Sequence, residues 1–96
     1  MPLVYAHVVR ARLRRMEGAG VGDVERELAE AERLAVEVSA QGLVPEVHGE
    51  RAALFQRDGR VGDARRELER ARALYREMGA GPNTARVAAE IGAMTG

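Results

Sequence analysis

Residues 59–78 read Gly-Arg-Val-Gly-Asp-Ala-Arg-Arg-Glu-Leu-Glu-Arg-Ala-Arg-Ala-Leu-Tyr-Arg-Glu-Met, and this stretch decides the fold. Its apolar residues recur every three or four positions, which places them on one face of an amphipathic helix. Arginine and glutamate fill the other faces. The apolar stripe consists of Val61, Ala64, Leu68, Ala71, Leu74 and Met78. The stretch therefore predicts a helix that buries one face.

The same pattern occurs earlier in the chain, so the sequence contains an internal repeat. Val21-Gly22-Asp23 matches Val61-Gly62-Asp63, and Arg26-Glu27-Leu28 matches Arg66-Glu67-Leu68 in the same register. The segment before each copy recurs as well, in a register longer by one residue. Its matching residues are His7, Arg10, Ala11, Leu13 and Gly18 in the first copy, and His48, Arg51, Ala52, Leu54 and Gly59 in the second. The change of register falls in a turn, so the repeating unit is two helices joined by that turn.

Helical periodicity covers five segments, at about residues 2–17, 21–41, 45–58, 59–78 and 83–94. Pro2 and Pro45 suit the first turn of a helix, where a missing N–H would have no intrahelical partner. Gly18, Gly42 and Gly79 suit helix ends, because glycine adopts the left-handed conformation at little cost. We therefore predict one all-α domain of five antiparallel helices. Repeat one covers residues 2–41, repeat two covers residues 43–79, and a capping helix covers residues 83–94.

Composition excludes several classes of protein. Hydrophobic residues make up 46% and charged residues 31% of the chain, which fits a folded helical domain and excludes a disordered one. Fifteen basic residues, all arginine, balance fifteen acidic residues. Zero net charge and 3% aromatic residues argue against nucleic-acid binding.

Neither a membrane segment nor disulfide chemistry is expected. The apolar run at residues 3–9 is far too short to span a bilayer and has no basic segment before it. There is no cysteine, so disulfides, thiol catalysis and cysteine metal sites are excluded. We therefore expect a cytoplasmic protein.

The second copy resembles a tetratricopeptide (TPR) repeat. That family places a small residue, an aromatic residue, and then Ala, a large apolar residue and Ala at fixed positions of its two helices. Those positions are occupied here by Ala52, Phe55, Ala64, Leu68 and Ala71. The first copy matches at Ala11, Leu28 and Ala31 but carries Val24 and Arg14 at the other two positions. The resemblance implies an α-solenoid of two helix–turn–helix repeats.

The length of the repeat and the aligned residues refine this resemblance. The period, about 40 residues, is longer than that of the standard TPR unit. In this respect the chain is similar to the lengthened repeats in the sensor regions of bacterial regulators and signalling ATPases. The TPR pattern implies a concave groove lined by the first helix of each repeat. Gly49 and Ala53 face this groove together with the candidate partner-binding residues, which are Tyr5, Val8, Arg12, Arg15, Glu46, Gln56 and Arg57.

Three of these residues offer a mode of binding. Arg12, Arg15 and Arg57 could hold a carboxylate or an acidic peptide through bidentate hydrogen bonds, although plain solubility also explains exposed arginines. The Lys/Asn carboxylate clamp of chaperone-adaptor TPR domains is absent, because Gly49 and Ala53 stand where it needs side chains.

Self-association is expected because two repeats leave apolar ends that need covering. The first helix is apolar on more than one face near its start, at Leu3, Val4, Val8 and Val9. We therefore predict a homodimer that uses these residues. The alternative is a fragment of a longer array.

Catalytic and metal-binding signals are weak. The only hydroxyl side chains besides tyrosine are Ser39, Thr84 and Thr95, and none lies in a nucleophile motif. His7 and His48 occupy equivalent positions, but no third metal ligand recurs with them. We expect no enzyme activity, no cofactor and no metal, and we interpret both histidines as packed or groove-edge residues.

Together these observations predict a non-catalytic module or scaffold that binds a protein or peptide and also associates with itself. One alternative is a sensor module of a bacterial regulator that binds a ligand in the concave groove. A second alternative is a small enzyme, which would need a deep pocket holding perturbed carboxylates or both histidines.

Overall fold

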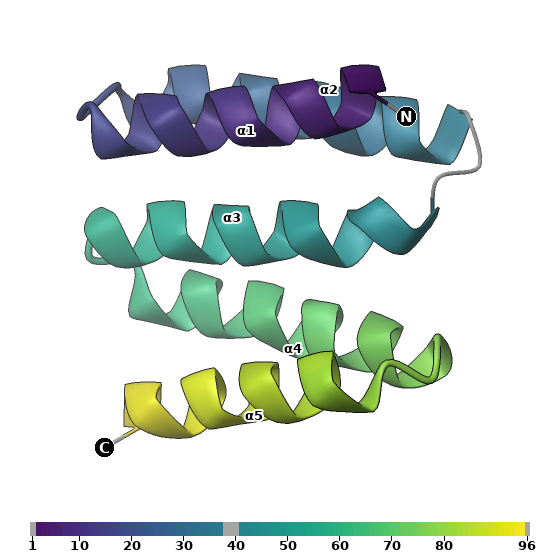
Figure 1. The fold of residues 1–96 in the computed structure, drawn as a ribbon. Coiled ribbons are helices and arrows are strands. Elements are labelled where there is room, and N and C mark those ends of the chain that lie inside the picture. The colour runs from purple at the N-terminus through teal and green to yellow at the C-terminus, as the bar shows by residue number, and fades with distance from the viewer. Residues whose placement is uncertain (1, 38–40, 96) are drawn as a thin grey trace.

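The computed structural model describes residues 2–37 and 41–95, without the side chains of residues 2–4, 41 and 95. It contains the helices α1 (Pro2–Met16), α2 (Val21–Glu37), α3 (Val44–Arg57), α4 (Val61–Glu77) and α5 (Gly81–Thr95). A short 3-10 helix, η1 (Gln41–Leu43), precedes α3. No strand occurs in the described ranges, so the all-α prediction is confirmed. Figure 1 shows consecutive helices running antiparallel. The molecule measures 33 × 31 × 16 Å along its principal axes.

The predicted end of the second helix, at about residue 41, falls at a gap in the described residues. The described part of α2 ends at Glu37, and Gln41 begins the 3-10 helix. Residues 38–40 lie outside the described part of the chain. The prediction that Gly42 ends a helix in the left-handed conformation is wrong, because Gly42 lies inside η1 and is not among the described glycines with a positive φ angle.

Three helices end in the same turn. Gly18, Gly59 and Gly79 have φ angles of 84°, 78° and 72°, the left-handed region that favours glycine. The N–H after each glycine donates to a carbonyl five residues earlier, in the pairs Ala19–Arg14 at 2.9 Å, Arg60–Phe55 at 2.8 Å and Ala80–Tyr75 at 2.9 Å. This is the Schellman pattern of helix termination. It confirms the predicted roles of Gly18 and Gly79.

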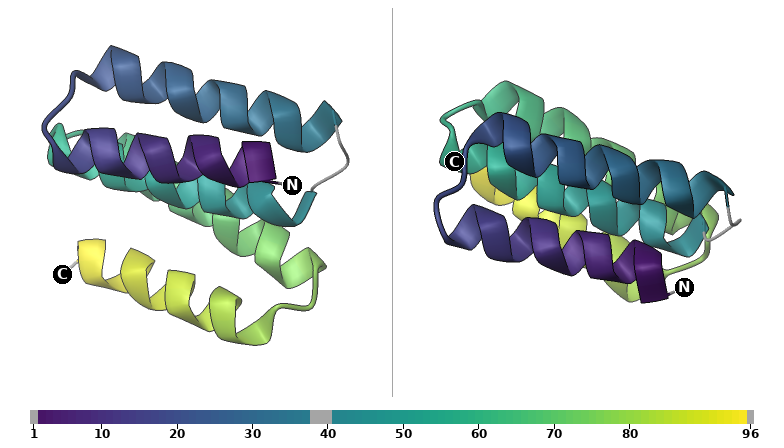
Figure 2. Two further views of the ribbon diagram at one scale, coloured as in Figure 1. Left: turned by 45° about the horizontal axis from the view of Figure 1, so that its top comes forward. Right: turned by 90° about the horizontal axis from the view of Figure 1, so that it is seen from above.

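The helices pack in chain order, each against the next. The α1–α2 and α3–α4 hairpins lie beside each other, and α5 packs on α4 (Figures 1 and 2). Helix α3 also contacts α1, so it touches both members of the first hairpin. This position makes α3 the central element of the domain.

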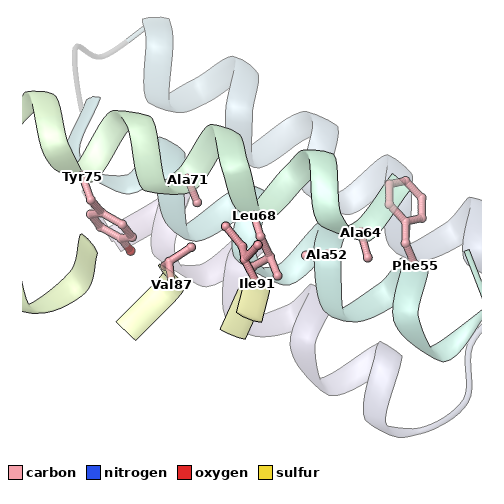
Figure 3. Close-up of a cluster of buried hydrophobic side chains, with 8 residues drawn as sticks. All are labelled: Ala52, Phe55, Ala64, Leu68, Ala71, Tyr75, Val87 and Ile91. Carbon is pink, nitrogen blue, oxygen red and sulfur yellow. The ribbon is translucent and has the colours of Figure 1, made fainter. Parts of the chain in front are cut away.

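Two apolar clusters form most of the core, and α3 contributes to both. The first cluster joins α1, α2 and α3 through Val8, Ala11, Val24, Leu28, Ala31, Val47 and Leu54. The second joins α3, α4 and α5 through Ala52, Phe55, Ala64, Leu68, Ala71, Tyr75, Val87 and Ile91 (Figure 3). Alanines at these contacts allow the helix axes to approach closely.

The predicted buried stripe of α4 is only partly correct. Ala64, Leu68 and Ala71 are buried, but Val61 and Met78 are about half exposed because they lie at the two ends of the helix, beyond the neighbours that cover its middle. Tyr75 is buried instead, at 5% exposure.

Candidate functional site

A groove of about 720 Å³ lies between α1, α3 and α5. Its floor is apolar and includes Ala52, Leu68, Ala71 and Val87 from α3, α4 and α5. Polar and charged side chains surround the floor. These are Tyr5, Arg12, Glu46, Glu50, Gln56, Tyr75, Asn83, Arg86 and Glu90. The groove thus combines an apolar base with a polar rim, as binding sites commonly do.

The structure brings most of the candidate groove residues together. Those that line the groove are Tyr5, Arg12, Glu46, Gly49, Ala53 and Gln56, as the family pattern implied. The other three candidates, Val8, Arg15 and Arg57, have different surroundings.

Val8 belongs to the core. It is completely buried and packs with α2 and α3, so it offers no surface to a partner either in the groove or in a dimer. Val9, a second candidate for self-association, is half-buried. The side chains of Leu3 and Val4 lie outside the described part of the structure.

Arg12 and Arg15 are held by a carboxylate of the protein itself. Arg12 donates Nε to Glu50 Oε1 at 2.7 Å, and Arg15 donates Nη2 to Glu50 Oε2 at 3.3 Å. The hydrogen bond and the negative charge of Glu50 raise the pKa of Arg12. Glu50 therefore ties α3 to α1 through both arginines. These contacts join residues 35 to 38 positions apart, so no local pattern could show them.

Arg57 caps the end of α1. Its Nη1 donates to the Arg15 carbonyl at 2.8 Å and its Nη2 donates to the Ala19 carbonyl at 2.6 Å. A cation there also complements the negative end of the helix dipole. Each of the three arginines thus already donates to an acceptor inside the domain, and an external carboxylate would have to use their remaining N–H groups.

Glu46 is the exception among the groove charges. Arg86 contacts Glu90 at 3.2 Å, and Arg12 contacts Glu50 as described above. In the described part of the chain, the Glu46 carboxylate has no hydrogen-bond or ion-pair partner, and it is only half-buried. Burial raises the pKa of the nearby Tyr75, so its phenol stays protonated at neutral pH. The groove therefore carries one negative charge without a direct partner.

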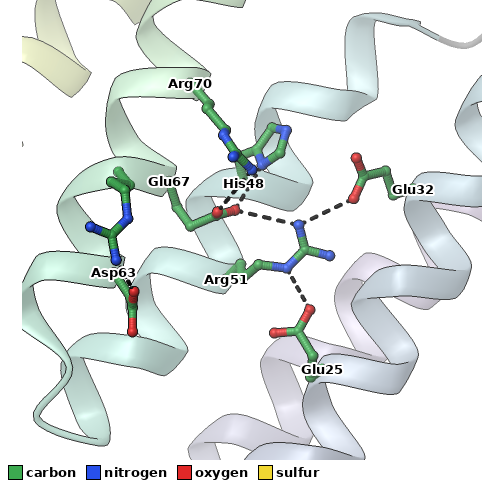
Figure 4. A network of polar contacts seen from close by, with 8 residues as sticks. Glu25, Glu32, His48, Arg51, Asp63, Glu67 and Arg70 are labelled. Atoms are coloured by element: carbon green, nitrogen blue, oxygen red, sulfur yellow. Dashed lines mark hydrogen bonds and ion pairs between the residues drawn. The ribbon is translucent and has the colours of Figure 1, made fainter.

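A second polar feature lies between the helices, away from the groove (Figure 4). His48 Nδ1 is 2.8 Å from Glu67 Oε1, and Arg51 Nη1 is 3.4 Å from the same oxygen. Arg51 also donates to Glu25 at 2.6 Å and to Glu32 at 3.1 Å. His48, Arg51 and Glu67 are all buried. The cluster joins α2, α3 and α4.

Charge compensation decides the ionisation of this cluster. Burial opposes the charge on Glu67, but the hydrogen bond from His48 and the charge of Arg51 outweigh it and lower the pKa of Glu67. Burial likewise opposes the charge on Arg51, yet Glu25, Glu32 and Glu67 raise its pKa. An ionised carboxylate can only accept a hydrogen bond, so His48 donates through Nδ1–H.

The first repeat contains a looser version of the same cluster. His7 Nδ1 contacts Glu27, and Arg10 lies 3.8 Å from the same carboxylate. These residues are the repeat equivalents of those in the buried cluster. The sequence contains both the recurring histidines and the recurring glutamate, whereas the histidines alone predict only packed or groove-edge residues. Their shared recurrence was the signal that could have predicted the pairing.

These clusters connect neighbouring helices through hydrogen bonds and ion pairs. Glu67 accepts from His48 and Arg51, and Arg70 lies 3.4 Å from its second oxygen. In residues 2–37 and 41–95, no group of three or more histidine, aspartate or glutamate side chains is placed to hold a metal ion. Among those residues there is also no helix with the length and apolar character needed to cross a membrane.

Comparison with known proteins finds no relative with which this site can be compared. No protein-family model matches the chain, and searches of curated proteins and of solved structures find no significant match.

Proposed function

We propose that this protein is a non-catalytic interaction module that binds a segment of another polypeptide in the groove between α1, α3 and α5. In this proposal the domain is a short α-solenoid. It consists of two TPR-like repeats, α1–α2 and α3–α4, and α5 caps its end. The proposed module needs no cofactor and catalyses no reaction.

Packing of the repeat residues supports the TPR-like part of the proposal. Ala52, Phe55, Ala64, Leu68 and Ala71 carry the resemblance, and all five lie in one core cluster (Figure 3). The groove also lies on the helices that the resemblance assigns to it, since its candidate residues come from α1 and α3.

The unpaired Glu46 and the apolar floor beside it are the observations from which we infer the kind of ligand. A peptide that lays apolar side chains on Ala53, Ala93 and Met94, which line the groove and are not fully buried, would remove apolar surface from water. A lysine or arginine on the same peptide would compensate Glu46. An acidic peptide would meet Glu46 and would compete with Glu50 for Arg12. The proposed ligand is therefore an apolar segment with a basic residue.

A selection experiment with a blocked groove tests this function. A Cβ at Gly49 would meet no atom within 4 Å, so Gly49→Phe can place its ring in the groove without disturbing the backbone. Peptides selected from a random display library on the natural protein should bind Gly49→Phe at least about tenfold more weakly, a change of about 1.4 kcal/mol. Gly62→Phe on α4 is the matched control, since its Cβ also meets open space.

A second variant tests the ligand chemistry. Glu46→Gln keeps the size of the side chain and removes its charge, so the selected peptides should lose affinity in proportion to their basic residues. Isothermal titration calorimetry measures both variants. Equal affinity for the natural protein and Gly49→Phe would contradict groove binding, and enrichment of acidic peptides would contradict the assigned chemistry.

A small ligand is the second candidate, as for a sensor module. The observation that favours it is the groove volume, which lies within the usual range of roughly 300–1,000 Å³ for ligand pockets. A metabolite library screened by thermal shift separates the two candidates. A compound that raises the melting temperature of the natural protein but not of Gly49→Phe would favour the sensor over the peptide module.

A further inference from the structure

Helix α3 holds the first hairpin through five positions on one side. Val47 and Leu54 are completely buried against α1 and α2. Glu50, Arg51 and Arg57 make the hydrogen bonds described above, to α1, to α2 and to the turn after α1. These five residues form a complete contact surface with an apolar part and a charged part.

The same five positions occur on α1, one repeat earlier in the chain, and there they are largely open. They are Ala6, Val9, Arg10, Leu13 and Met16, which we name the α1 outer face. Leu13 is 53% exposed, whereas its equivalent Leu54 is completely buried. The Arg10 side chain is 54% exposed, against 10% for Arg51. Met16 is 69% exposed. The surface of α3 is therefore packed against other helices, whereas the equivalent α1 outer face is not.

The residues of α2 that cover this surface of α3 indicate which partner would fit the α1 outer face. Helix α2 presents an apolar stripe that includes Leu28 and Ala31 to the core cluster it shares with α3. It also presents Glu25 and Glu32, two turns apart, and both accept hydrogen bonds from Arg51. Arg10 has only a loose contact of 3.8 Å with Glu27.

We propose that the α1 outer face binds an acidic amphipathic helix of another polypeptide. The partner helix would place a small apolar stripe on Leu13 and Ala6 and would offer two carboxylates, two helical turns apart, to Arg10. This site is separate from the groove, so it stands or falls independently of the proposed peptide binding.

Charge complementarity argues against a second copy of this chain as the occupant. Helix α1 contains four arginines and no acidic residue, so two α1 helices packed on each other would bring like charges together. The positions of α4 that correspond to Glu25 and Glu32 are Arg65 and Arg72. Within α2, Glu25 and Glu32 already bind Arg51. Three further acidic residues of α2, also two turns apart, are already paired with Arg26 and Arg33; they are Asp23, Glu30 and Glu37. No other helix in the described part of the chain repeats this acidic pattern.

A synthetic helix with the sequence of residues 21–37 is a direct probe. A hydrocarbon staple on its outer side keeps so short a helix folded. Titrated by fluorescence anisotropy into the full chain, the probe should bind, and Leu13→Glu or Arg10→Glu should weaken binding at least about tenfold. Val61→Glu is the control, because Val61 is equally exposed but lies on α4.

A charge exchange makes the test specific. A probe with Glu25→Arg and Glu32→Arg should bind the natural protein poorly and should recover binding to the Arg10→Glu variant. Circular dichroism confirms that each variant is folded, which is expected because the substituted side chains are exposed.

Three results would overturn the proposal. The probe could fail to bind at concentrations up to about 1 mM. Binding could persist in Leu13→Glu, which would indicate that the probe replaces the protein's own α2. Light scattering could show a stable dimer that Leu13→Glu dissociates, which would assign the face to a second copy.

Discussion

Glu67 shows how a single residue connects three helices. Its carboxylate accepts hydrogen bonds from His48 and Arg51, both on α3, and Arg51 in turn reaches two carboxylates of α2. A buried acceptor of this kind stabilises the fold only while its charge is present and its donors are in place. The cluster therefore makes stability depend on pH.

The substitution Glu67→Gln should lower the free energy of unfolding at pH 7 by about 1–3 kcal/mol, because buried donors lose a charged acceptor. The pKa of Glu67 is lowered from its ordinary value of 4.5, so its contribution is present above about pH 4.5 and is lost as the pH falls through the folded-state value. The difference between the natural protein and the variant should therefore shrink as the pH is lowered from 4.5. Urea denaturation across this range measures it.

The control for this prediction is Glu69→Gln on the same helix. Glu69 is exposed and has only a contact of 3.8 Å with Arg65, so its loss should change stability little at any pH. A stability difference for Glu67→Gln that stays constant down to about pH 3 would contradict the assigned role of the Glu67 charge.

Arg57 is the second test at this scale. Arg57→Ala removes two hydrogen bonds to the carbonyls at the end of α1 and should cost about 1 kcal/mol of stability. Arg76→Ala is the control, since the Arg76 side chain has no hydrogen-bond or ion-pair partner among the described residues. Chemical denaturation compares the two variants. If both lose the same stability, Arg57 does not cap α1.

At the level of helices, equivalent positions of the two repeats can be compared, because one is buried and the other is exposed. Leu54→Ala should cost about 2–5 kcal/mol, because it leaves a cavity in the core between the first hairpin and α3. Leu13→Ala at the equivalent position of α1 should change stability by less than about 0.5 kcal/mol, because Leu13 is 53% exposed. Thermal and urea unfolding measure both. A large loss for Leu13→Ala would show that the α1 outer face is covered in solution.

Two glycines should respond to alanine in opposite directions. Gly79 ends α4 with a φ angle of 72°, so Gly79→Ala should cost about 1–2 kcal/mol through backbone strain. Gly49 lies inside α3 with open space around its Cβ position, so Gly49→Ala should raise stability by about 0.5–1 kcal/mol. The same denaturation assay tests both signs. Stabilisation by Gly79→Ala would contradict the turn geometry.

The helices were predictable from sequence because their signals are local. Periodic apolar residues and the glycines at 18 and 79 act within a few residues of each helix end, and the structure agrees there. The pairings of Arg12 with Glu50 and of His48 with Glu67 join different helices. No local pattern indicates the pairing of Arg12 with Glu50, whereas the shared recurrence of the histidines and of Glu27 and Glu67 does indicate the pairing of His48 with Glu67.

At the scale of the whole molecule, the proposed binding surfaces are of two kinds. The groove between α1, α3 and α5 has an apolar floor and an unpaired Glu46, whereas the α1 outer face is apolar and carries the exposed Arg10. Their opposite charges favour different partners, one basic and one acidic. The protein would then connect two polypeptides.

The most direct test of the groove proposal is a chemical-shift map. The peptide with the highest affinity from the library selection is titrated into the ¹⁵N-labelled protein, and backbone amide signals are followed by NMR. The account predicts the largest shifts on the groove sides of α1, α3 and α5, including the amides of Gly49, Ala53 and Asn83. Shifts confined to the outer surfaces of α2 and α4, with these three amides unchanged, would contradict it.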